Sequence, residues 1–131
     1  KDFKKFIYAS QVLQAEGMRI GLDAHRRSQP YCMGTLYWQL NDCWPVTSWS
    51  SRDYYGNWKA LHYTAQDAFA PISLSLEKTE NNSFNIWVIS DTTNCADTLL
   101  INTYSLEGRL LFSSKRFVKI KSKSQLIDFV K

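Results

Sequence analysis

The chain has 131 residues, of which 44% are hydrophobic and 21% charged, and its formal net charge is +4 at pH 7. This length suits one ordinary domain and is short for two. No apolar stretch approaches the roughly 20 residues of a membrane-spanning helix, and no base-reading motif accompanies the positive charge. The composition therefore predicts a globular protein that binds neither membranes nor nucleic acid.

Residue types that ligate metals are few and scattered. Cys32, Cys43 and Cys95 form no close pair, and His25 and His62 have no acidic or sulfur partner nearby in the sequence. An odd number of cysteines without a C-x-x-C pair argues against a disulfide framework and a zinc site. We expect three buried free thiols and no metal.

The first part of the chain predicts a helix followed by a strand. From residue 2 to 27 the apolar residues Phe6, Leu13 and Ile20 recur at helical spacing, and Pro30 follows the predicted end. Residues 31–40, "YCMGTLYWQL", are an apolar run of strand length without strict alternation. Such a run is typical of a strand buried on both faces, as in parallel sheets and barrels.

A polar loop and a second helix come next. The loop runs from residue 41 to 53 and contains Pro45. Residues 54–69 again carry apolar residues at helical spacing, with Trp58 on the apolar stripe, where it is expected in the core. Helix, buried strand, loop and helix in this order indicate the end of an α/β unit.

The pattern changes at Pro71. Five segments rich in β-branched and aromatic residues follow, separated by turn signals, and they predict five antiparallel strands of a β-sandwich with one buried face. The segments are residues 72–79, 84–91, 98–105, 109–120 and 124–130. A complete immunoglobulin-like sandwich has about seven strands. We therefore expect the chain to be a segment of a longer protein that spans the boundary between two domains.

Four of the five tryptophans lie within residues 35–63, "TLYWQLNDCWPVTSWSSRDYYGNWKALHY". Together with the preceding helix "YASQVLQAEGMRIGLDAHRR", this stretch resembles the closing part of the catalytic barrel of β-mannosidases in glycoside hydrolase family 2. The resemblance covers roughly residues 3–70. It implies a mixed fold: residues 1–70 would be the C-terminal end of a (β/α)8 TIM barrel, with its last strand and helices. Residues 71–131 would be the first strands of an incomplete immunoglobulin-like antiparallel β-sandwich.

The activity that this resemblance implies is retaining, exo-acting hydrolysis of terminal non-reducing β-D-mannose. Retaining hydrolysis uses two carboxyl groups about 5 to 5.5 Å apart. In the family both are glutamates on earlier barrel strands, so the resemblance implies that this chain holds no catalytic residue and is inactive alone. It implies no cofactor. The expected partners are a β-mannoside oligosaccharide or glycan substrate and the remaining segments of the same polypeptide. Family members are lysosomal in animals and periplasmic or secreted in many bacteria.

The resemblance also points to four candidate substrate-binding residues, Trp38, Asn41, Asp42 and Trp44. Trp38 would lie at the end of the eighth barrel strand, where its indole face could pack against the C–H face of a pyranose. Asn41 and Asp42 could meet sugar hydroxyls, although Asp42 could instead hold loop backbone. Trp44 and Trp49 either line the pocket rim or fasten the loop to the barrel.

Two alternatives remain open. One is another family 2 exo-glycosidase, such as a β-galactosidase, β-glucuronidase or glucosaminidase, because sugar selectivity also depends on other loops. The other is a non-catalytic carbohydrate-binding or interaction module, which predicts exposed tryptophans. Helical patterning on both sides of residues 31–40 argues against the second alternative.

Overall fold

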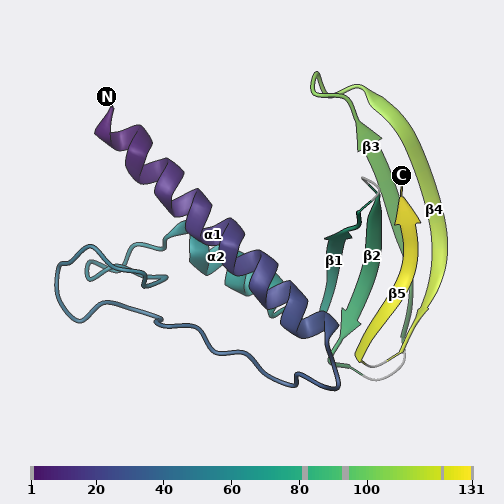
Figure 1. Ribbon diagram of the computed structural model, residues 1–131, viewed down its shortest axis with the longest axis horizontal. Helices are drawn as coiled ribbons and strands as arrows, with labels where there is room; N and C mark the ends of the chain where they lie inside the picture. The colour runs from purple at the N-terminus through teal and green to yellow at the C-terminus, as the bar shows by residue number, and fades with distance from the viewer. Residues whose placement is uncertain (1, 81–82, 93–94, 122, 131) are drawn as a thin grey trace.

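The computed structural model describes residues 2–80, 83–92, 95–121 and 123–130. Its helices lie side by side, a long loop runs beside them, and the strands lie to the other side of α1 (Figure 1). The elements are α1 Phe3–Arg27, α2 Ala60–Ala68, β1 Ile72–Lys78, β2 Phe84–Ser90, β3 Cys95–Tyr104, β4 Leu110–Ile120 and β5 Lys123–Val130. The expected mixture of helices and antiparallel strands is therefore confirmed.

Helix α1 matches the predicted helix but buries a different face. Asp2 caps its N-terminus by accepting a hydrogen bond from the backbone N–H of Lys4 at 3.0 Å. The predicted apolar stripe of Phe6, Leu13 and Ile20 is exposed, whereas Leu22 is buried. The helices α1 and α2 pack against each other, and in the part of the chain that the structure describes no element covers the stripe of Phe6, Leu13 and Ile20.

The predicted strand over residues 31–40 is not formed. Residues 32–37 have no regular structure, and Leu36 is exposed. A β-strand needs a neighbouring segment that pairs with its backbone hydrogen-bonding groups. In residues 31–40 such pairing is present only at the C-terminal end. There the Ser51 N–H donates to the Gln39 carbonyl at 3.0 Å, and the Arg52 N–H donates to the Leu40 carbonyl at 2.9 Å. The expectation of a buried strand was wrong for this chain.

Helix α2 begins at Ala60, six residues later than predicted. The intervening residues form a tight turn, in which Asp53 Oδ1 accepts from the Asn57 N–H at 2.8 Å and Gly56 adopts φ +89°. Trp58 therefore precedes the helix and is 45% exposed. The expectation that Trp58 lies in the core was also wrong.

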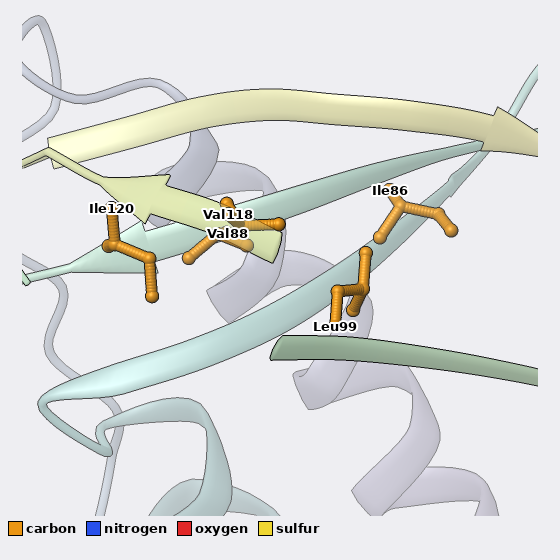
Figure 2. Packing of buried hydrophobic residues seen from close by; sticks show 5 residues of the cluster. All are labelled: Ile86, Val88, Leu99, Val118 and Ile120. Carbon is orange, nitrogen blue, oxygen red and sulfur yellow. The ribbon is translucent and has the colours of Figure 1, made fainter. Parts of the chain in front are cut away.

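All five predicted strands are present, with boundaries that differ by at most a few residues. They form two antiparallel sheets, one in the order β1-β2-β5 and the other with β3 beside β4. One apolar cluster contains residues from both sheets, and Figure 2 shows its side chains gathered between the strands that carry them: Ile86, Val88, Leu99, Val118 and Ile120. The immunoglobulin-like character and the domain division near residue 70 stay predictions.

Strand β1 turns a polar residue, rather than its leucines, into the interior. Leu74 and Leu76 are exposed, whereas Ser75 is fully buried. The Ser75 hydroxyl donates to Asp23 Oδ2 at 3.1 Å and accepts from the guanidinium of Arg27, so α1 covers this position with charged side chains. Polar contacts thus join α1 to the sheet.

Arg26 makes the most extensive of these contacts. Its guanidinium is buried and donates to the carbonyls of Ala68 and Ala70, the second at 2.8 Å, and to the hydroxyl of Ser73 at 3.3 Å. It also forms an ion pair with Asp91, with Nη2 and Oδ2 2.6 Å apart. Arg26 therefore connects α1 to the end of α2, the start of β1 and the residue after β2.

The three cysteines are free, as expected, but none of them is buried, and Cys43 is exposed. Within the described ranges, no group of three or more His, Cys, Asp or Glu side chains could hold a metal ion. Among the same residues, no helix is long and apolar enough to cross a membrane.

Candidate functional site

The predicted sugar-binding residues lie on the segment between the two helices. Trp38 is 73% exposed and Trp44 is 64% exposed, whereas Asp42 is buried. The peptide bond between Trp38 and Gln39 is cis. Asn41 and Arg52 form an isolated parallel β-bridge. This bridge joins the end of the segment that carries Trp38 to the residues just before the turn at residues 53–57.

A cleft of about 260 Å³ opens beside this bridge. Its lining residues are Asn41, Asp42, Arg52, Asp53, Tyr54, Tyr55 and Gly56. The structure thus brings Asn41 and Asp42 together with two tyrosines, whose rings meet edge to face at 5.3 Å between centroids. Trp38 and Trp44 do not line this cleft. An amide beside aromatic faces can take a polar ligand with an apolar side, which is the chemistry of a sugar ring.

The carboxylate of Asp42 is occupied by its own loop. Ser48 Oγ donates to Oδ1 at 2.6 Å, Ser50 Oγ donates to Oδ2 at 2.8 Å, and Lys59 Nζ lies 3.5 Å from Oδ2. The Ser48 hydroxyl above all, with Ser50 and the Lys59 ammonium, outweighs burial and lowers the pKa of Asp42. Asp42 is therefore ionised and satisfied, which favours its role in holding loop backbone.

Asp53, the other acidic residue of the cleft, is also engaged in its own turn. Both of its carboxylate oxygens accept from Asn57, from the backbone N–H and from the side-chain amide, each at 2.8 Å. These hydrogen bonds lower the pKa of Asp53. Neither acidic residue of the cleft has the raised pKa that a general acid needs.

Sequence reasoning missed a stack of side chains behind the cleft. The Arg52 guanidinium lies 4.7 Å from the centroid of the Trp58 ring, and the Trp58 and His62 rings stack with centroids 3.7 Å apart. Arg52 Nε also donates to the Gly56 carbonyl at 3.2 Å. The spacing of four residues between Trp58 and His62 was the available signal, since it places both side chains on one face of the predicted helix over residues 54–69.

Comparison with known proteins relates the chain to one kind of glycosidase. It is 41% identical over 98 residues to the β-mannosidase of Rattus norvegicus, which covers 70% of this chain and 11% of that protein. It is 46% identical over 79 residues to the β-mannosidase of Bos taurus, covering 55% and 9% respectively. It is 32% identical over 104 residues to β-mannosidase B of Aspergillus niger, covering 68% and 12%.

The chain is similar in sequence to the β-mannosidases of glycoside hydrolase family 2. It spans about a tenth of the length of these curated relatives. No protein-family model matches it. The resemblance found in the tryptophan-rich stretch is thereby confirmed.

Solved structures with a similar fold include the exo-chitosanase CsxA of Amycolatopsis orientalis. The TM-score is 0.78 at 22% identity, over 95% of this chain and 15% of that one. A second structure, described as the exo-β-D-glucosaminidase CsxA with inhibitors, gives a TM-score of 0.79 at 22% identity over the same shares. At this identity the likeness shows the fold alone.

Proposed function

We propose that this chain is part of an exo-acting retaining β-mannosidase that removes terminal non-reducing β-D-mannose. The observation that carries the proposal is its 41% identity to a β-mannosidase over 70% of the chain. Identity to the exo-β-D-glucosaminidase structure is only 22%. The difference favours mannose among the sugars that related enzymes remove.

Within this enzyme the chain supplies a wall of the sugar pocket. The indole faces of Trp38 and Trp44 are exposed, and Asn41 lies at the cleft. An indole face packs against the C–H face of a pyranose while an amide meets its hydroxyls. Asp42 belongs to the same site through the loop that its carboxylate holds.

The two catalytic glutamates lie in other parts of the parent enzyme. Asp42 and Asp53, the acidic residues of the cleft, both have lowered pKa values and partners within their own loop. Retaining hydrolysis requires one carboxyl group that stays protonated until it donates to the leaving group. The contacts of both aspartates support a structural rather than a catalytic role.

The direct test is turnover of an aryl β-D-mannoside. We would measure this chain at micromolar concentration beside a preparation extended upstream through the remaining barrel segments. Release of the aryl group only by the extended preparation is the expected result. Turnover by the chain alone would contradict the placement of the catalytic pair and make Asp42 the first residue to substitute.

A different family 2 exo-glycosidase is the second candidate, favoured by the shared fold with the exo-β-D-glucosaminidase. A panel of aryl glycosides distinguishes the two. We expect the extended enzyme to hydrolyse the β-mannoside with the highest kcat/KM. A higher value for the β-galactoside, β-glucuronide or β-glucosaminide would replace mannose in the proposal.

A carbohydrate-binding or interaction module is the third candidate, favoured by the exposure of Trp38, Trp44 and Trp49. It requires that this chain alone binds manno-oligosaccharides. Isothermal titration of the chain with mannotriose checks this requirement. Millimolar or tighter binding together with an inactive extended preparation would support the module.

A further inference from the structure

The loop between residues 42 and 59 is closed by a compact polar cluster, which we call the Lys59 clamp: Lys59, Asp42, Ser48 and Ser50. Lys59 Nζ donates to Ser50 Oγ at 2.9 Å and to the Ser48 carbonyl at 3.2 Å, besides its ion pair with Asp42. Both serine hydroxyls donate to Asp42. The ammonium of Lys59 and the carboxylate of Asp42 thus connect the two ends of the 18-residue loop over residues 42–59 with Ser48 and Ser50 near its middle.

Asp42 and Ser50 of the clamp are buried and Ser48 and Lys59 are partly buried, while the large side chains of the same loop are exposed. Only 1% of the Asp42 side chain and 15% of the Lys59 side chain are exposed, and Ser50 is fully buried. Trp44 and Trp49 are exposed. Burying an ion pair contributes little net stability, but removing one partner leaves an uncompensated charge. Hydrogen bonds and the ion pair of the clamp thus hold the loop in its conformation, and the indole rings of Trp44 and Trp49 stay exposed to solvent.

The clamp also reaches the segment that carries Trp38. Asp42 N–H donates to the Arg52 carbonyl at 3.1 Å, and Ser51 Oγ donates to the Leu40 carbonyl at 3.0 Å. Gln39 and Leu40 accept from the backbone beside Ser50. A shift of the clamp would therefore move the backbone on which Trp38 and Asn41 are placed.

We propose that the Lys59 clamp is a positioning unit of the sugar pocket: Lys59, through Asp42 and the two serines, sets the places of Trp38, Asn41 and Trp44 against the mannose ring. The assignment rests on the function proposed above. Lys59 and Asp42 touch no substrate in this scheme and act through the loop. They keep the loop ordered before the sugar binds. Because less conformational entropy is then lost on binding, the enzyme binds its substrate more tightly.

The experiment compares Lys59→Met and Lys59→Arg with the parental sequence in the extended enzyme. Lys115→Met is the matched control, because Lys115 is an exposed lysine on β4. Hydrogen exchange of the hydrogen-bonded amides of Asp42, Ser50, Ser51 and Arg52 reports on the loop, and active-site titration gives the concentration of working enzyme. We expect Lys59→Met to speed exchange and to raise KM for an aryl β-mannoside at least 10-fold. Lys59→Arg should restore much of the affinity, and Lys115→Met should change neither quantity.

The split between KM and kcat distinguishes positioning from simple destabilisation. A variant that is merely less stable yields less active enzyme, so its uncorrected kcat falls while KM is unchanged. Faster loop exchange with unchanged KM would overturn the assignment, and so would unchanged exchange in Lys59→Met. A parental enzyme that hydrolyses a different aryl glycoside would contradict the proposed sugar only, and the same variants would be measured on that glycoside. A parental enzyme that hydrolyses none of them would overturn both proposals.

Discussion

Arg26 on α1 and Asp91 after β2 form an ion pair with 2.6 Å between Nη2 and Oδ2, although 65 residues separate them in the chain. The same guanidinium donates to the carbonyls of Ala68 and Ala70. These bonds satisfy backbone acceptors where α2 ends and β1 has not yet begun. Arg26 is therefore the main polar link between the helices and the strands.

Arg26→Met should lower the free energy of unfolding by about 3 kcal/mol, because it leaves the carbonyls of Ala68 and Ala70 without their charged donor. Urea unfolding followed by circular dichroism measures the change. Arg109→Met, at an exposed arginine of the β3–β4 turn, is the control and should stay within about 0.5 kcal/mol of the parental value. An Arg26→Met midpoint equal to that of the control would show that the link contributes nothing.

Glu77 should make the chain less stable in acid. Its carboxylate accepts from the Asn85 amide at 3.1 Å and the Trp87 indole N–H at 2.9 Å, and these bonds, with Arg27 nearby, lower its pKa. A lowered folded-state pKa means that the unfolded chain binds more protons as the pH falls below about 4.3. The contribution of Glu77 is therefore present above that pH and is lost on acidification.

Glu77→Gln removes this dependence. We expect its free energy of unfolding, measured from pH 6 down to pH 2.5, to fall less steeply with acid than that of the parental chain. The two curves should converge at the acid end, where both side chains are uncharged. Curves that run parallel through the whole range would exclude Glu77 as a source of the acid sensitivity.

Gly56→Ala should strain the turn that precedes Trp58. Gly56 has φ +89°, and an added Cβ would lie 2.9 Å from Nη2 of Arg52. A left-handed conformation costs a non-glycine residue about 1 kcal/mol or more. The flexible guanidinium can move away, but it would then leave the face of Trp58.

Gly108→Ala separates the two effects, because Gly108 has φ +84° with no atom within 4 Å of an added Cβ. In both variants the positive φ angle should lower the free energy of unfolding by a similar amount. Only Gly56→Ala should shift the indole N–H resonance of Trp58 in an NMR spectrum. An unmoved resonance would mean that Arg52 stays on the ring despite the new methyl group.

Leu61→Ala should be among the most damaging substitutions in the helices. Leu61 is 1% exposed on α2, which packs against α1. Truncating a buried leucine costs about 3 kcal/mol through lost burial and the cavity left behind. Leu106→Ala is the control, since Leu106 is fully exposed in the β3–β4 turn, and its unfolding midpoint in urea should not move.

Trp38→Ala tests the pocket wall in the extended enzyme. If the indole stacks on the sugar in the transition state, kcat/KM for an aryl β-mannoside should fall by an amount worth about 2 to 4 kcal/mol. Trp38→Phe keeps an aromatic face and should lose less. Near-parental kinetics in a folded Trp38→Ala enzyme would remove Trp38 from the site.

The strands after Pro71 were predictable because their evidence is local. β-branched and aromatic residues between turn signals indicate strands regardless of which strand lies beside which. The same holds for the extent of α1, which helical spacing and the following Pro30 indicate, although that spacing did not indicate which face is buried. Local sequence signals do not predict the sheet order β1-β2-β5 or the burial of Ser75, since both depend on contacts between residues far apart in the chain.

For the candidate site, too, the sequence predicted some features and only the tertiary structure determined others. An ordered string of residue types, "WQLND" and "WPVTSWS", was enough to relate the chain to the β-mannosidases, because such a string is specific without any knowledge of its shape. Residues 31–40 read as a buried strand from their apolarity, yet a strand exists only where another chain segment accepts and donates its hydrogen bonds. The Lys59 clamp was invisible for the same reason. A lysine, an aspartate and two serines spread over 18 residues carry no periodic signal, and only the fold of the loop brings their charges and hydroxyls within hydrogen-bonding distance.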